Sequence, residues 1–111
     1  MYQYKIEHVA KVRSGDTLEL IIDLGFKVST TVTIRLDSAE TPEYGSFDRY
    51  GKDEGQQARD FTVAWFKDSE TPFTLHTLRD RRGDYFGTVY DAQGVSLGDA
   101  LVAAGLARTV T

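Results

Sequence analysis

Three carboxylate residues lie in two short polar segments that a small fold could bring together. Asp16 stands between two strand-like segments, and Glu40 and Glu43 lie in a polar segment further along the chain. Converging carboxylates raise one another's pKa unless a cation lies among them, and hard oxygen ligands favour Ca²⁺ or Mg²⁺ over zinc. Such a cation can orient a phosphate while a remaining carboxylate activates water. These residues therefore suggest metal-dependent hydrolysis of a phosphate ester.

Arg35 lies on the polar face of the strand-like segment that ends just before Glu40. Beside a bound cation, an arginine suits the negative charge that develops on a phosphodiester. If residues 17–24 and 27–36 pair as a hairpin, Asp16 and the Glu40 segment lie at the same end of the sheet, next to Arg35. From the residues alone, a solvated acidic loop with Arg35 as its counter-ion explains the same pattern equally well.

The composition limits the possible protein classes. The chain has 111 residues, 41% of them hydrophobic, which is enough for one domain over residues 1–111. It has no cysteine, which excludes disulfides, thiolate zinc sites and a cysteine nucleophile. A net charge of −4 argues against a non-specific nucleic-acid binder, although acids gathered at a metal site bias the count in the same direction. No apolar run approaches the roughly 20 residues that cross a bilayer, so we expect no membrane partner and a cytoplasmic location.

Hydrophobic periodicity predicts short strands with two helices. Apolar and polar residues alternate most clearly in the second and third strands, whereas apolar residues recur every three or four positions in the helices. The strands are expected at residues 4–12, 17–24, 27–36, 71–78, 85–90 and 106–110, and the helices at 54–67 and 97–104. This order favours a mainly β fold with some α, a five-stranded closed barrel of the oligonucleotide-binding (OB) type, with a split α+β sheet as the competitor.

The two predicted helices carry recognisable local signals. Ser96 has the side chain of a good N-cap for the second helix, and Gly105 is suited to end it. The apolar stripe of the first helix is expected to consist of Ala58, Phe61, Ala64 and Trp65. We therefore expect Phe61 and Trp65 to pack in the core rather than to bind a ligand.

Several short motifs occur in order along nearly the whole chain. They are Ser14-Gly15-Asp16-Thr17, Ile34-Arg35-Leu36, Glu40-Thr41-Pro42-Glu43, Tyr50-Gly51, Asp99-Ala100-Leu101-Val102 and Gly105-Leu106-Ala107. This order resembles the staphylococcal nuclease (thermonuclease) family, whose pattern is a D-G-D-T turn, an R-L strand, a D-T-P-E loop, a Y-G or F-G pair and an E-A-L-V-x-x-G-L-A helix. Several dispersed matches in the right order are far more specific than any one of them.

The resemblance implies a five-stranded OB barrel and a Ca²⁺-dependent phosphodiesterase that acts on DNA and RNA, preferably single-stranded. Carried over by position, Asp16 becomes a metal ligand, and Thr41 offers its backbone carbonyl to the same ion. Glu40 falls at the position of the family's second metal aspartate. Glu43 is expected to orient or deprotonate the attacking water, and Arg35 to bind the scissile phosphate.

The sequence departs from the family's pattern at two site positions. Glu40 is one methylene longer than the family's aspartate, which the loose coordination geometry of Ca²⁺ tolerates. The family's second phosphate-binding arginine falls on Asp84 or on Thr88, depending on the alignment. Losing one such donor typically costs about 10²–10³ in rate. Arg81 and Arg82, in the same turn, are the candidates to contact the substrate instead.

The chain stops at Thr111, whereas the family continues into a long C-terminal helix. We expect a partner or a second copy to cover the barrel surface that this helix would otherwise pack against, or the fold to be marginally stable. Two functions remain in competition. The first is the nuclease, and the alternative is a catalytically degraded barrel that binds nucleic acid or a protein partner.

Overall fold

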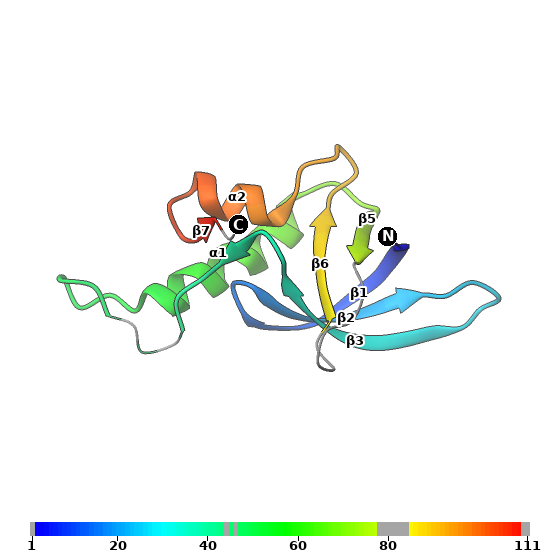
Figure 1. Cartoon of the computed structure of the whole chain (residues 1–111), viewed down its shortest axis with the longest axis horizontal. Coiled ribbons are helices and arrows are strands. Elements are labelled where there is room, and N and C mark those ends of the chain that lie inside the picture. The colour runs from blue at the N-terminus through cyan, green and yellow to red at the C-terminus, as the bar shows by residue number, and fades with distance from the viewer. Residues whose placement is uncertain (1, 44, 46, 78–84, 110–111) are drawn as a thin grey trace.

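Five strands of the chain close into a barrel, and two helices pack against one end of it (Figure 1). The computed structural model describes residues 2–43, 45, 47–77 and 85–109. Its elements are β1 (Tyr2–Ser14), β2 (Thr17–Asp23), β3 (Ser29–Leu36), β4 (Ala39–Glu40), α1 (Glu54–Asp68), β5 (Phe73–Thr77), β6 (Tyr85–Tyr90), α2 (Leu97–Ala103) and β7 (Arg108–Thr109). No helix in these ranges combines the length and the apolar character that crossing a membrane requires.

The barrel has the strand order β1-β2-β3-β6-β5, and β5 returns to pair with β1. All neighbouring strands run antiparallel except β3 and β6, which are parallel. The prediction of a closed five-stranded barrel is therefore confirmed, and the split α+β sheet is excluded. The inward-facing side chains of alternate positions fill the barrel. Those with at most 1% exposure are Leu18, Leu20, Ile34, Leu75 and Val89.

Helix α1 lies against β1 and begins at an aspartate cap. The side chain of Asp53 accepts a hydrogen bond from the backbone N–H of Gln56 at 3.2 Å. The expected apolar stripe is only partly right, because Ala64 is exposed and Thr62 is fully buried. Trp65 meets Phe66 of the same helix and Phe73 of β5 in an aromatic cluster. The helix face that packs on the barrel therefore keeps Ala58, Phe61 and Trp65 but includes Thr62 instead of Ala64.

Helix α2 begins as expected, with Ser96 accepting a hydrogen bond from the backbone N–H of Asp99 at 3.0 Å. Gly105, directly after the helix C-cap, has a φ of 74°, a conformation that favours glycine. The chain then turns back so that β7 pairs with β4 in a small separate sheet. The sequence pattern missed β4, because two residues are too short to show a period and their only strand partner lies far along the chain.

Candidate functional site

Asp16 occupies the tight turn between β1 and β2, with its side chain turned into the protein. Only 8% of the residue is exposed. Its Oδ1 accepts hydrogen bonds from the hydroxyls of Ser14 at 2.7 Å and Thr17 at 3.2 Å. Its Oδ2 accepts a bond of 3.3 Å from the backbone N–H of Thr41. The carboxylate is thus held between its own turn and a segment 25 positions away.

Arg35 lies directly across from this turn. It pairs in register with Thr17 of β2, and the next residue, Leu36, donates its N–H to the Asp16 carbonyl at 2.9 Å. The Arg35 side chain is exposed on the outer face of the barrel. Its Cζ lies 6.0 Å from the ring centroid of Phe86, the residue paired with it on β6. The guanidinium therefore rests beside an aromatic ring at the rim next to Asp16.

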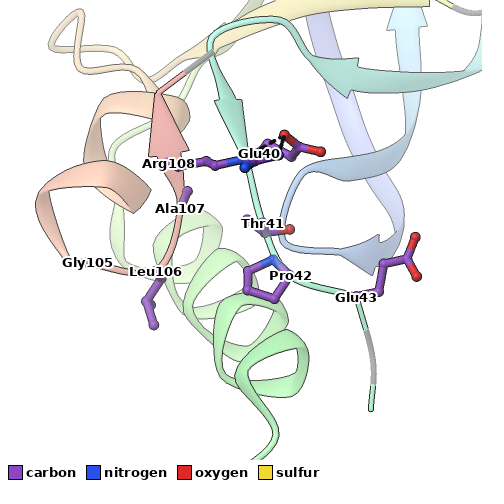
Figure 2. Close-up of a pocket in the computed structure, with 8 residues that line it drawn as sticks. All are labelled: Glu40, Thr41, Pro42, Glu43, Gly105, Leu106, Ala107 and Arg108. Carbon is purple, nitrogen blue, oxygen red and sulfur yellow. Dashed lines mark hydrogen bonds and ion pairs between the residues drawn. The ribbon is translucent and has the colours of Figure 1, made fainter. Parts of the chain in front are cut away.

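The segment from Glu40 to Glu43 runs from β4 past the Asp16 turn. Thr41 is buried, whereas Glu40 and Glu43 are exposed. Figure 2 shows the Glu43 side chain pointing away from Arg108, and therefore away from β7. The hydrogen bond between Thr41 and Asp16 fixes the middle of this segment, so Glu43 lies two residues from a point in direct contact with Asp16.

The Glu40 carboxylate is engaged by an arginine that the sequence analysis did not single out. Arg108 of β7 donates to Glu40 Oε2 from Nε at 3.0 Å and from Nη2 at 2.7 Å (Figure 2). The two side chains are 47% and 78% exposed, so this is a surface ion pair. No local pattern in the sequence pointed to this pair, because it depends on the pairing of β4 with β7 across 68 positions.

The oxygen atoms around Asp16 suit a hard cation in chemistry but form an incomplete set. The Thr41 hydroxyl oxygen is buried and lacks a hydrogen-bond partner among the residues that the structure describes. The Asp16 carboxylate and the Thr41 carbonyl add further hard donors. However, the described ranges contain no group of three or more Asp, Glu, His or Cys side chains close enough to hold a metal ion. Glu40, the expected third ligand, is turned toward Arg108.

Thr62, a residue that the sequence analysis did not single out, helps to hold the Asp16 turn in place. The hydroxyl of fully buried Thr62, on α1, donates to the Gly15 carbonyl at 2.8 Å. Gly15 also packs closely against α1 and Thr41. A Cβ there would lie 2.8 Å from both the Ala58 Cβ and the Thr41 Cγ2. The only sequence signal for Thr62 is its spacing, four positions after Ala58 on the same helix face.

Three of the positions at which the sequence departs from the family pattern, or that were expected to compensate for a departure, lie outside the described residues. These are the substrate candidates Arg81 and Arg82, together with Asp84. The alternative position for the missing arginine, Thr88, is described. Its hydroxyl donates to Asp37 Oδ1 at 2.9 Å, so this position carries a neutral group that is already bonded to a carboxylate.

A hollow of about 620 Å³ separates the 40–43 segment from the chain that follows α2 (Figure 2). Its opposite wall consists of residues 105–108. The acidic groups of Glu40 and Glu43 and the guanidinium of Arg108 are its charged groups. The hollow thus extends from the 40–43 segment, whose Thr41 contacts Asp16, toward the chain that follows α2.

The comparison with known families agrees with this architecture. The model of the family described as staphylococcal nuclease homologue matches residues 33–111, which include Arg35, the 40–43 segment and both helices. A comparison with curated proteins gave no match. The family match covers more than half of the chain, and the closed barrel is the fold that the resemblance implied. The chain therefore belongs to the staphylococcal nuclease homologue family.

Proposed function

We propose that this chain is a Ca²⁺-dependent phosphodiesterase that hydrolyses DNA or RNA, preferably single-stranded, at the rim beside Asp16. The observation that carries the proposal is the hydrogen bond from the Thr41 backbone to the buried Asp16 carboxylate. It joins two residues, 25 positions apart, to which the family resemblance assigns the same ion. Membership of a nuclease-type family whose members are generally Ca²⁺-dependent supports the same conclusion.

The proposed metal ligands are Asp16, the carbonyl of Thr41 and Glu40. When bound, Ca²⁺ would supply positive charge that offsets the charge of the phosphate and withdraws electron density from phosphorus. The buried Thr41 hydroxyl has no hydrogen-bond partner within the described part of the chain. This supports a polar occupant at this point, because buried polar groups are normally hydrogen-bonded. Glu40 has to turn from Arg108 or share its carboxylate to take part, and this competition weakens the third ligand.

Glu43 and Arg35 act on the reacting groups. Glu43 accepts a hydrogen bond or a proton from the attacking water, which suits an exposed carboxylate two residues beyond Thr41. Arg35 donates hydrogen bonds to the non-bridging phosphate oxygens and stabilises the charge that grows on them in the transition state. Its position across from the Asp16 turn supports this role, because Arg35 and the proposed metal ligand Asp16 then lie at the same rim of the barrel.

The experiment is a cleavage assay with single-stranded DNA and RNA at high enzyme concentration, with added Ca²⁺ and with a chelator. We expect slow, Ca²⁺-dependent cleavage that Glu43→Gln abolishes. Glu70→Gln removes an exposed carboxylate in the segment after α1 and serves as the matched control. If Glu43→Gln cleaves as fast as the wild type, Glu43 does not have the proposed role. If cleavage is absent with Ca²⁺, the enzyme proposal fails.

A second candidate is a barrel that binds nucleic acid without cleaving it. Two contacts favour this alternative. Arg108 holds Glu40, and Thr88 presents a hydroxyl bonded to Asp37 where one alignment places the family's second arginine. Family members generally bind nucleic acids, and phosphate contact through Arg35 needs no metal.

Fluorescence anisotropy with a labelled single-stranded oligonucleotide in chelator separates the two candidates. The binding module predicts that the oligonucleotide binds equally well with and without Ca²⁺, and that it remains intact. Arg35→Ala should then weaken binding in a salt-dependent manner. The enzyme predicts tighter binding when Ca²⁺ replaces chelator, tested with Glu43→Gln so that the substrate survives the measurement.

A further inference from the structure

The hairpin between β2 and β3 ends in an exposed apolar tip at the far end of the barrel from the helices (Figure 1). Phe26 at the tip is fully exposed, and Leu24 and Val28 beside it are about half exposed. Phe26 and Lys27 have φ angles of 54° and 61°, in the left-handed region that favours glycine or asparagine. In the isolated chain, a phenylalanine at this position is unfavourable for two reasons: its backbone has a positive φ, and its apolar ring is exposed to water.

An apolar cavity opens in the barrel mouth directly beside this tip. It has a volume of about 330 Å³, and Leu24 belongs to its wall. The partly exposed rings of Tyr2, Tyr4 and Tyr85 form its rim, and Ile34 and Leu75, with at most 1% exposure, close its floor. An apolar cavity of about 150 Å³ is already large enough to bind benzene. This mouth is therefore large enough for an aromatic side chain.

The projecting Phe26 tip and the apolar cavity in the barrel mouth lie at the same end of the barrel. A two-fold axis between two copies would let each Phe26 enter the other copy's mouth, because an isologous interface uses the same patch twice. The exposed parts of Tyr2, Leu24, Phe26, Val28 and Tyr85 amount to on the order of 500 Å² of largely apolar surface. That is more than half of the roughly 800 Å² that each partner of a standard interface buries.

The charge at the tip also favours a second copy over a nucleic acid. Residues 23–28 carry one acid, Asp23, and one base, Lys27, so their net charge is zero. Such a tip does not repel a copy of itself, and it lacks the basic excess that attracts a polyanion. We propose that two copies of this chain associate through their β2–β3 hairpins, with the Phe26 ring of each in the barrel mouth of the other.

Analytical ultracentrifugation of the full chain, from micromolar to near-millimolar concentration, tests the proposal. We expect a concentration-dependent dimer, and a dissociation constant at least about tenfold weaker for Phe26→Ser, as for the loss of a central anchor. Val63→Ser removes an exposed valine from α1 and should leave the dimer unchanged. A wild type that stays monomeric throughout, or a Phe26→Ser variant that dimerises like the wild type, overturns the proposal.

A mixing experiment tests the reciprocal insertion itself. Thr30→Trp fills the mouth from an exposed wall position and leaves the tip intact, whereas Phe26→Ser leaves the mouth intact. Each variant alone should associate more weakly than the wild type, and the mixture should regain one insertion and associate more tightly than either variant alone. A mixture without association contradicts the reciprocal geometry. If the wild type is monomeric and Phe26→Ser instead loses affinity for a single-stranded oligonucleotide, the tip is a nucleic-acid contact.

Discussion

The hydroxyl of Thr62 donates a hydrogen bond of 2.8 Å to the carbonyl of Gly15, 47 residues earlier in the chain. Both groups are out of contact with water, and the bond ties α1 to the turn that carries Asp16. The position of Asp16 is thus set by a helix that supplies none of the proposed ligands.

Replacing Thr62 by valine keeps the shape of the side chain but removes its donor. The buried Gly15 carbonyl then has no partner on α1, and we expect a loss of about 1–3 kcal/mol in the free energy of unfolding. Urea denaturation of both proteins measures this loss. Thr62→Ser keeps the hydroxyl and should retain more of the stability than the valine variant. Equal stability of the wild type and the valine variant would show that the bond contributes nothing.

Gly15→Ala is expected to disturb the same turn by crowding. The new Cβ would lie 2.8 Å from the Ala58 and Thr41 side chains, so the turn or the helix has to shift. Overpacking of this kind typically costs about 1–3 kcal/mol. Ala58→Gly removes one of the two clashing groups, so the two changes combined should cost less than the sum of each alone. Additive effects in this double-mutant cycle would contradict the close approach.

The sequence predicted the barrel because its strands show a period of two and its helix caps use standard side chains. Leu18, Leu20 and Ile22 alternate in the sequence as they do in the core. By contrast, the pairing of β4 with β7, and with it the Glu40–Arg108 contact, joins segments too short to carry a period. The sequence analysis did not single out Thr62, whose burial follows from the approach of α1 to Gly15.

The positions of the candidate site residues could be anticipated from the hairpin register, because Thr17 pairs with Arg35. The state of the Glu40 side chain could not be anticipated in this way. The orientation of the Glu40 carboxylate depends on Arg108, which lies 68 positions later in the chain.

Removing Arg108 is expected to favour Ca²⁺ at the candidate site. The guanidinium engages Glu40, a proposed Ca²⁺ ligand, and adds positive charge beside it. Because the pair is exposed and screened, Arg108→Gln should tighten Ca²⁺ binding only about two- to fivefold. Isothermal titration, and the rise in melting temperature with added Ca²⁺, both measure the change without an activity assay. Lys67→Gln, which removes a positive charge from the last turn of α1, is the control. A weaker affinity in Arg108→Gln would mean that the arginine helps to orient Glu40.

The N-cap of α1 should make stability fall in acid. The hydrogen bond from the Gly45 backbone N–H has the largest effect on Asp53 and lowers its pKa below the usual 3.8. Desolvation opposes it to a smaller extent, and hydrogen bonds from the backbone N–H groups of Gln56 and Gly55 add to the lowering of the pKa. A carboxyl whose pKa is lower in the folded state stabilises the fold above the unfolded value and loses that contribution as the pH falls through the folded value. Denaturation between pH 6 and pH 2.5 should therefore show a shallower loss for Asp53→Asn than for the wild type. An identical pH dependence of the two proteins would contradict this role.

Arg35→Lys is expected to separate function from stability. The side chain is exposed on the outer face of the barrel, so its replacement should change the free energy of unfolding by less than about 0.5 kcal/mol. Lysine keeps the charge but loses the planar fork that binds two phosphate oxygens at once. The cleavage rate should fall about 10²-fold, as for other donors to a developing negative charge. Single-turnover kinetics and urea denaturation of the same preparations measure the two effects. A lysine variant that cleaves at the wild-type rate would remove Arg35 from the transition state and leave it as a surface cation beside Phe86.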